Sequence, residues 1–173
     1  LLFQAYDAFL NIGGIANLSV YHEGRLHAWD IAAANQVLNF LARKEGLDFD
    51  EDGALAKLGK VDYGLMDKLD KIDFYDFAPP RSLDNQYVTN TYLPLLDGVS
   101  ARDGLATFTE HLVSRTIKEL IRFGQPSKNL LVTGGGAYNS FLIEKLQGKL
   151  PDVYVHVPSG ALVEYKEALI MGF

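Results

Sequence analysis

Apolar and polar residues alternate at the start of the chain, which is the pattern of half-buried β-strands. The alternation runs through residues 7–12, 16–21 and 25–31, and Glu23-Gly24 supplies a turn between the second and third runs. Three consecutive strands joined by short turns predict an antiparallel meander.

Helical spacing replaces this alternation after the third predicted strand. The apolar positions that recur on one helical face are Ala33, Val37, Phe40 and Leu41. The pattern stops near Gly46, so a helix should follow the strand directly. Residues 48–97 are mixed, with an expected helix around residues 65–69, and we expect this segment to be lid-like or variable.

The strongest helical pattern begins at Ser100. Its stripe consists of Leu105, Phe108, Leu112, Thr116, Leu120 and Phe123. Ser100 and Asp103 resemble a capping pair, and Gly124 and Pro126 should end the helix. We therefore expect a central core helix.

Strands and helices alternate in the rest of the chain. Residues 130–133 and 153–157 are expected strands, and residues 138–146 and the segment from residue 160 onward are expected helices. This alternation predicts a parallel portion of the sheet. The fold class is therefore α/β, with a mixed sheet flanked by helices, and a length of 173 residues suits one domain.

The composition argues against several classes of protein and of metal-binding or disulfide site. The net charge is −6 without a basic run, which argues against DNA or RNA as a partner, and no apolar run approaches the length that crosses a bilayer. No cysteine is present, which excludes disulfides and thiolate zinc sites. No signal peptide is recognised, so we expect a cytoplasmic protein.

Nothing in the sequence indicates a structural metal. The acidic residues 48–52 lack the alternating oxygen ligands and terminal Glu of a calcium loop. The four histidines, His22, His27, His111 and His156, are widely spaced, and we interpret them as surface or strand-face residues.

Two glycine breaks interrupt apolar runs and suggest a nucleotide site. Gly13-Gly14 could present backbone N–H groups to phosphate oxygens, and Gly134-Gly135-Gly136 could take positive φ and approach a bulky ligand. Each break alone is better explained by an ordinary turn, because Gly-Gly is a common turn signal. Asp30 lies at the end of the third strand, where a carboxylate could cap the next helix.

Five segments together resemble a known family. They are Asn11-Ile-Gly-Gly-Ile-Ala-Asn-Leu-Ser19, Asp30 with Asn35, Phe49-Asp-Glu-Asp-Gly-Ala54, Pro80-Arg-Ser-Leu83 and Val132-Thr-Gly-Gly-Gly-Ala-Tyr-Asn139. In this order they resemble the C-terminal lobe of the anhydro-N-acetylmuramic acid kinase family, within the actin, Hsp70 and sugar-kinase superfamily. The resemblance implies one lobe of the actin-like ATPase (ribonuclease H-like) fold.

The resemblance also implies a reaction. Members of that family use ATP, with Mg²⁺ on the nucleotide, to convert 1,6-anhydro-N-acetylmuramic acid into N-acetylmuramic acid 6-phosphate in cell-wall recycling. Asp30 corresponds to the catalytic base. The implied nucleotide-binding residues are Gly13, Gly14, Asn17, Gly134, Gly135, Gly136 and Asn139, and the implied sugar-binding residues are Asn35 and Glu167. Glu167 could equally lie on a solvated helix face.

The chain departs from the family pattern near the proposed base. Ala32-Ala33-Ala34 stands where the family has Gly-Pro-Gly, and residues 81–86 replace Lys-Ser-Thr-Gly-Arg-Glu. A diverged, non-catalytic nucleotide-binding or chaperone-like domain is therefore the alternative.

The chain resembles only one lobe, and it starts at Leu1 without Met. We interpret it as a fragment that lacks the N-terminal lobe and is inactive alone. Homodimers are common in the family, and Phe74, Tyr75 and Phe77 could form an interface or a lobe-packing surface.

Overall fold

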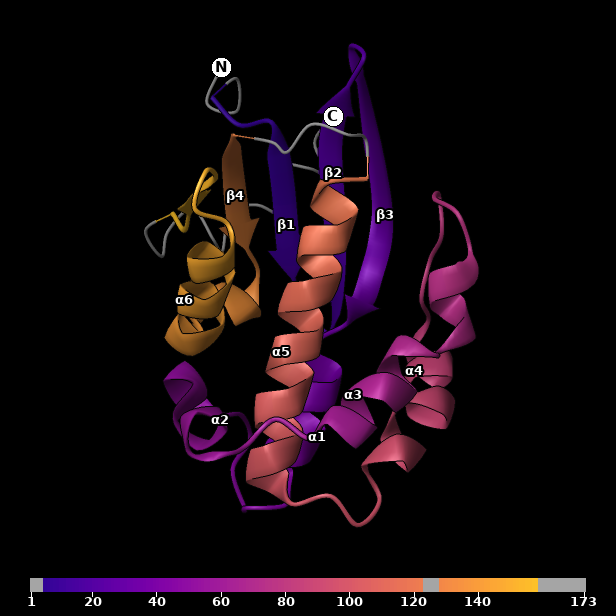
Figure 1. Cartoon of the computed structure of the whole chain (residues 1–173), viewed down its shortest axis with the longest axis vertical. Coiled ribbons are helices and arrows are strands. Elements are labelled where there is room, and N and C mark those ends of the chain that lie inside the picture. Colours follow the sequence, from indigo (N-terminus) through magenta and orange to yellow (C-terminus); the bar gives the residue numbers. More distant parts are fainter. Residues whose placement is uncertain (1–4, 123–127, 159–173) are drawn as a thin grey trace.

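The computed structural model describes residues 5–122 and 128–158. A five-stranded sheet runs through it in the order β3-β2-β1-β4-β5 (Figure 1). The strands are β1 (Ala8–Ile12), β2 (Ile15–His22), β3 (Arg25–Ala33), β4 (Asn129–Thr133) and β5 (Tyr154–His156). β1, β2 and β3 are antiparallel neighbours, whereas β4 pairs with β1, and β5 with β4, in parallel. The predicted mixed sheet with its meander is confirmed.

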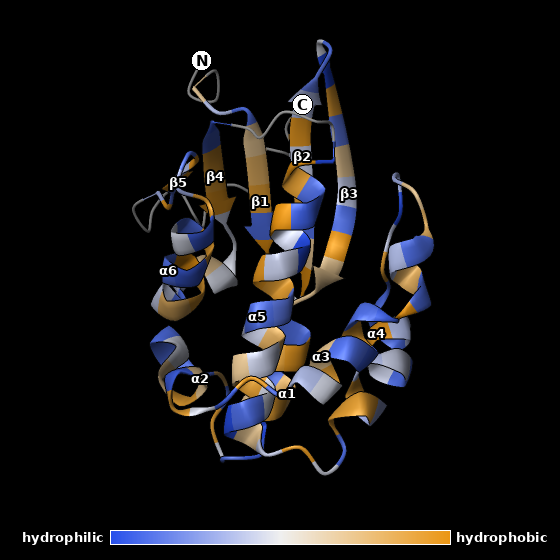
Figure 2. Ribbon diagram, in the orientation of Figure 1, coloured by the Kyte–Doolittle hydropathy of each residue, from blue (hydrophilic) through white to orange (hydrophobic). Residues whose placement is uncertain are grey.

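The sheet has one apolar face and one mixed face, because successive side chains in a strand point to opposite sides. Leu10, Leu18 and Trp29 are opposite one another on β1, β2 and β3, and all three are buried. The intervening Phe9 and Asn11 are half-buried. Figure 2 shows hydrophobic and hydrophilic residues alternating along β3 and interleaved along the helices.

Six α-helices accompany the sheet within the described residues. They are α1 (Asn35–Arg43), α2 (Ala54–Leu58), α3 (Tyr63–Asp70), α4 (Asn85–Thr91), α5 (Ala101–Leu120) and α6 (Ser140–Lys149). The 20-residue α5 lies across the sheet and contacts α1, α2, α3 and α6 (Figure 1).

The predicted central helix is confirmed as α5. The Ser100 hydroxyl accepts a hydrogen bond from the Asp103 N–H at 3.1 Å, which caps the helix as expected. Leu105, Phe108 and Leu112 on its apolar stripe are almost fully buried. The proposed stop signals Gly124 and Pro126, and the helix predicted from residue 160, lie outside the described residues.

Two predicted boundaries are wrong. β3 continues to Ala33, because Ile15 and Ala16 of β2 pair with Ala33 and Ala32, so α1 begins only at Asn35. Tyr138 belongs to a 3₁₀ turn, Gly135–Tyr138, and α6 begins at Ser140.

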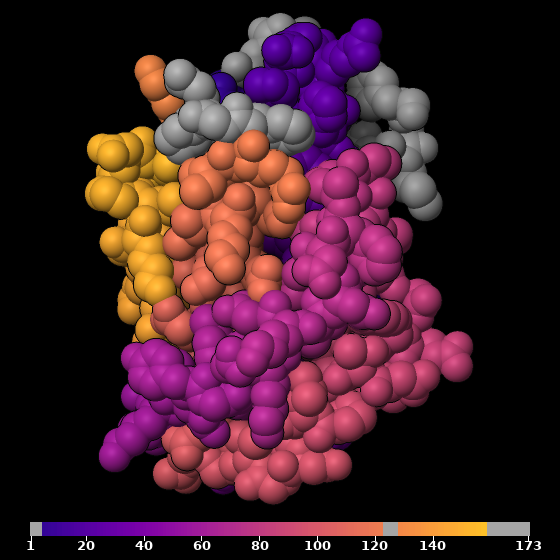
Figure 3. Space-filling view, turned by 45° about the vertical axis from the view of Figure 1, so that its right-hand side comes forward, coloured from indigo at the N-terminus to yellow at the C-terminus, as the bar shows by residue number. Residues whose placement is uncertain are grey.

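Residues 48–97 form a packed part of the molecule, seen from magenta to pink in Figure 3. The helix predicted around residues 65–69 is α3, and α2, α4 and the 3₁₀ turns Glu51–Gly53, Asp73–Asp76 and Leu93–Leu96 join it. Leu69, Tyr92 and Leu96 are fully buried. The segment therefore belongs to the core, and the expectation of a lid-like part is corrected.

Two further expectations change with this packing. His111 is not a surface residue, because it is fully buried on α5. The aromatic segment is also mostly internal: Phe74 is buried and Tyr75 packs against the core, which leaves only Phe77 exposed among the three. This supports internal packing over an interface for Phe74 and Tyr75.

Candidate active site

The Asp30 carboxylate lies at a small open pocket beside the edge strand β3. The pocket is lined by Asn17, Ala28, Trp29, Asp30, Pro80, Arg81 and Ser82. Three groups donate hydrogen bonds to the carboxylate: Asn17 Nδ2 to Oδ1 at 3.1 Å, and Ser82 Oγ and the Leu83 N–H to Oδ2 at 3.0 and 2.8 Å. These bonds fix the orientation of the carboxylate.

Asp30 does not cap the following helix. The N-cap of α1 is Ala34, which has no side-chain acceptor. The alternative interpretation of Asp30 as a helix cap is therefore wrong, and the side chain instead joins β3 to residues 82 and 83.

The Gly13-Gly14 turn supplies the cap that Asp30 does not. The N–H groups of Ala34 and Gln36 donate to Gly14 O at 2.9 and 3.2 Å, and the Asn35 N–H donates to Gly13 O at 3.0 Å. Neither glycine has positive φ. The turn therefore lacks the left-handed residue of an anion-binding nest, and its carbonyl groups serve the N-terminus of α1.

Packing against β1 explains two of the three glycines at the end of β4. Gly134 has φ of +83°, and a Cβ there would lie 2.7 Å from Ile12 O. A Cβ at Gly136 would lie 2.2 Å from Ile12 Cγ2. Gly135 is exposed, and its Cβ would lie 3.4 Å from Asn35 Nδ2. Among these glycines, Gly135 is the one that leaves backbone open to a ligand.

Two of the three predicted asparagines, Asn35 and Asn139, form hydrogen bonds at the ends of these elements. Asn35 Nδ2 donates to Ile12 O at 3.2 Å, which ties α1 to the end of β1. Asn139 Oδ1 accepts from the Leu142 N–H at 3.1 Å and caps α6. Glu167 lies outside the described residues.

A row of polar side chains connects the two halves of the predicted site. Asp30 is opposite Asn17 on β2, Asn17 is opposite Asn11 on β1, and Asn11 is opposite Thr133 on β4. Opposed residues share a sheet face, so the row leads from Asp30 to Thr133, the residue before Gly134. The sheet thus brings the proposed base and the glycine turn to the same face.

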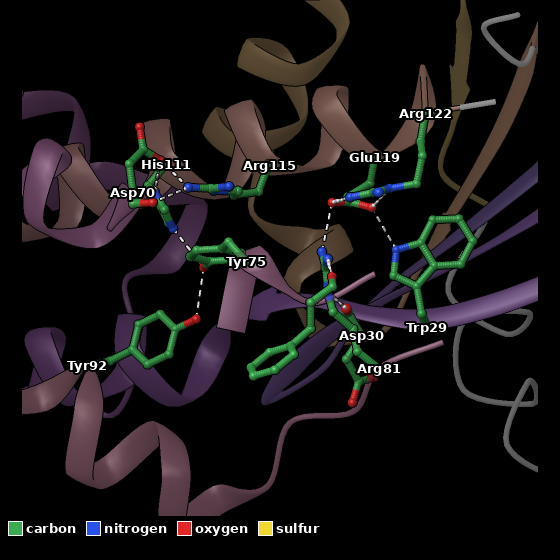
Figure 4. A network of polar contacts seen from close by, with 11 residues as sticks. Trp29, Asp30, Asp70, Tyr75, Arg81, Tyr92, His111, Arg115, Glu119 and Arg122 are labelled. Carbon is green, nitrogen blue, oxygen red and sulfur yellow. Dashed lines mark hydrogen bonds and ion pairs between the residues drawn. The ribbon is translucent and has the colours of Figure 1, made fainter. Parts of the chain in front are cut away.

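The buried ion-pair network on the other side of β3 from the Asp30 carboxylate was not predicted from the sequence. Glu119 of α5 accepts hydrogen bonds from Trp29 Nε1 at 2.9 Å, Arg81 Nη2 at 2.7 Å, and Arg122 Nε and Nη2 at 2.7 and 2.9 Å (Figure 4). Burial would raise the pKa of Glu119, but the hydrogen bonds from Arg122 and Arg81 outweigh it and hold the pKa below its usual value.

A second network lies one and two turns earlier on α5. Tyr75 Oη lies 2.9 Å from His111 Nε2 and 2.8 Å from Tyr92 Oη (Figure 4). Arg115 Nη2 donates a hydrogen bond to Asp70 Oδ1 at 2.6 Å. The interaction with His111 lowers the pKa of Asp70 to about 2, whereas burial lowers the pKa of His111. A clue was present in the sequence, since residues 111, 115 and 119 repeat every four positions on a buried helix.

Residues 5–122 and 128–158 contain neither a metal-binding cluster nor a membrane-spanning helix. No group of three or more His, Asp or Glu side chains is arranged to hold a metal ion there. In the same part of the chain, the helices are too short or too polar to cross a membrane.

Solved structures show the same fold. An activator of 2-hydroxyisocaproyl-CoA dehydratase from Clostridium difficile, solved with bound ADPNP, aligns with a TM-score of 0.56 at 16% identity, covering 91% of this chain and 55% of that one. Component A of (R)-2-hydroxyglutaryl-CoA dehydratase from Acidaminococcus fermentans aligns with a TM-score of 0.53 at 19% identity, covering 97% and 60%. Both support the actin-like ATPase fold.

The sequence relatives described below are all named anhydro-N-acetylmuramic acid kinase. An anhydro-N-acetylmuramic acid kinase from Prochlorococcus marinus is 35% identical over 93% of this chain and 48% of its own length. A kinase of the same name from Rhizobium rhizogenes is 36% identical over 81% of this chain and 38% of its own length. One from Aliivibrio fischeri is 30% identical over 98% of this chain and 48% of its own length. The chain thus spans less than half the length of these relatives.

The family model described as anhydro-N-acetylmuramic acid kinase matches residues 3–172. This match covers almost the whole chain and agrees with the relatives found independently. The chain therefore belongs to the anhydro-N-acetylmuramic acid kinase family.

Proposed function

We propose that this chain is the C-terminal lobe of an ATP-dependent sugar kinase that converts 1,6-anhydro-N-acetylmuramic acid into N-acetylmuramic acid 6-phosphate. The reaction serves cell-wall recycling in the cytoplasm. Asp30 is the general base. Water adds at the anhydro carbon and gives its proton to Asp30, while the released sugar oxygen takes the γ-phosphoryl group and ADP leaves.

One observation carries the proposal: the Asp30 carboxylate faces an open pocket and is oriented by three donors. A general base must lie within one hydrogen bond of the proton that it removes. A carboxylate fixed between a strand and a loop meets this need better than a freely rotating one, because misplacement costs rate.

In this proposal, ATP binds along the row of polar side chains that runs from Asp30 to Thr133 and ends at the glycine turn. Gly135 is exposed there, and we assign its backbone to the adenosine side of ATP. We assign Gly13, Gly14 and Asn17 to the phosphate side, as positions near the phosphates and not as an anion-binding nest, because neither glycine has positive φ. Phosphoryl transfer depends mostly on positioning and charge neutralisation. In this proposal Mg²⁺ is bound to the phosphates of ATP and would supply part of the charge neutralisation.

A second lobe is part of this proposal. The relatives are more than twice as long as the portion that aligns with this chain, and the cleft of such kinases closes between two lobes. We therefore propose that the full-length protein is active and that the isolated chain is not. Homodimer formation remains a prediction.

The experiment is an assay of the full-length protein with ATP and 1,6-anhydro-N-acetylmuramic acid. We expect formation of the 6-phosphate, detected by mass spectrometry, together with ADP release that depends on the sugar. Binding of ATP without sugar-dependent turnover would contradict the kinase proposal.

That second outcome is expected of the non-catalytic alternative, which one observation favours. Ala32, Ala33 and Ala34 are fully buried where the family has glycine and proline. Such a domain would bind nucleotide with no dependence on the sugar.

A further inference from the structure

We propose that Glu119 and Arg81 are positioning residues for Asp30. Their buried ion pair holds the loop of residues 80–83 against β3, and this loop in turn holds the Asp30 carboxylate. The inference rests on the proposed function for its effect on turnover. The structural part of the inference, that the ion pair fixes the loop, does not depend on the proposed function.

The loop wraps around the open edge of the sheet at Asp30. The Asp30 N–H donates to Arg81 O at 3.0 Å, and Arg81 Nε donates back to Asp30 O at 3.3 Å. The next two residues then supply the Ser82 hydroxyl and the Leu83 N–H to Asp30 Oδ2. The same short segment therefore binds both the backbone and the side chain of the proposed base.

Glu119 fixes this loop from the opposite side of the strand. Trp29 precedes Asp30 on β3, so its side chain points to the other face of the sheet, where it donates to Glu119 Oε2. Arg81 donates to Glu119 Oε1. One carboxylate thus binds the strand next to Asp30 and the loop that holds Asp30 (Figure 4).

Burial excludes a direct role of this pair in binding substrate. The side chains of Arg81 and Glu119 are each only 4% exposed. Arg81 also stacks over Phe74, with 4.8 Å to the ring centre, and donates through Nη1 to Phe77 O at 2.6 Å. The guanidinium is therefore enclosed by protein. Arg81 acts on Asp30 through its own bonds to the Asp30 backbone and through the neighbouring Ser82 and Leu83.

Loss of either partner should free the loop. Without Glu119, the buried Arg81 loses its counter-ion, which is strongly unfavourable, so the loop would move to solvate the guanidinium. Without the Arg81 guanidinium, the loop loses its bond to Glu119, which keeps its ion pair with Arg122. Ser82 and Leu83 would then leave the carboxylate. Misplacement of a catalytic group by about 1 Å can cost on the order of 10²-fold in rate.

The test compares Glu119→Gln and Arg81→Lys with a matched control in the full-length protein. Glu110→Gln is the control, because Glu110 lies on the same helix and pairs with Lys145 and Lys149 of α6, away from the pocket. We expect kcat to fall on the order of 10²-fold in Glu119→Gln and less in Arg81→Lys, with KM for both substrates nearly unchanged. Glu110→Gln should keep the wild-type kcat.

Two readouts separate positioning from general damage to the fold. Amide hydrogen exchange should become faster at Leu83 in Glu119→Gln, while amides of β1 and β2 keep their wild-type protection. The double variant Glu119→Gln, Arg81→Lys should lose no more activity than the worse single variant, because both act through the same loop.

The outcomes distinguish this inference from the proposed function. If the wild type shows no kinase activity, selective exchange at Leu83 still supports the fixing of the loop, and unchanged exchange overturns it. If the wild type is active, retained kcat in Glu119→Gln overturns the inference. Equal loss of protection throughout the sheet would also overturn it, since that indicates a merely structural role.

Discussion

At the scale of single residues, polar groups in this protein are held by partners that are distant in sequence. Asp30 binds residues 82 and 83, and Glu119 binds Trp29, 90 positions away. The four-residue spacing of residues 111, 115 and 119 is visible in the sequence, but it does not identify the partners of these residues. The sequence indicated Asp30 through its place at a strand end and through the family resemblance, but it could not indicate that Arg81 and Glu119 stand behind it.

The buried His111 leads to a prediction about pH. Burial lowers its pKa in the folded state, so below the usual pKa of about 6.5 the unfolded chain binds protons that the folded chain does not. The free energy of unfolding should therefore fall as pH decreases from 7 to 5. Asp70, with its pKa lowered to about 2, adds a loss of stability only below about pH 4.

Urea unfolding of the chain at pH 5, 6 and 7 measures this dependence. His111→Gln keeps a polar group beside Tyr75 but cannot take up a proton, so its unfolding free energy should change less between pH 7 and 5 than that of the wild type. An equal change in both proteins would show that His111 is not the responsible group.

At the scale of elements, the predictable parts were those with a long local pattern. The meander and α5 follow directly from alternation and from a stripe repeated along 20 residues. The short α2 and α4, with five and seven residues, offer too little periodicity to be recognised. The boundary at residues 32–34 was misplaced because alanine favours helix locally, whereas pairing with β2 extends the strand.

The glycine turn after β4 provides a prediction at the same scale. Gly136→Ala places a Cβ within 2.2 Å of Ile12 Cγ2, so it should lower the free energy of unfolding by about 1–3 kcal/mol. Gly135→Ala is the matched variant, since its Cβ meets only Asn35 Nδ2 at 3.4 Å. It should leave stability nearly unchanged and weaken ATP binding.

Urea unfolding and calorimetric ATP titration measure the two effects separately. If Gly135→Ala is as destabilising as Gly136→Ala, the difference that we draw between a packing glycine and a ligand-facing glycine is wrong.

At the scale of the whole molecule, the proposed function requires this chain to provide one wall of an active site. The chain spans 38–48% of the relatives described above, and the pocket at Asp30 is open. We expect the isolated chain to form no 6-phosphate under conditions in which the full-length protein does. Product formation by the isolated chain, measured by mass spectrometry, would contradict the requirement for a second lobe.

The most direct test of Asp30 as the base is the kcat of the Asp30→Asn variant of the full-length protein, measured together with its affinity for ATP. We predict a fall in kcat of about 10²–10⁴-fold with ATP affinity nearly unchanged, because the amide keeps the shape of the carboxylate but cannot accept the proton from water. Asp97→Asn, which alters an exposed carboxylate outside the pocket, should behave as the wild type. Undiminished turnover in Asp30→Asn would contradict the account.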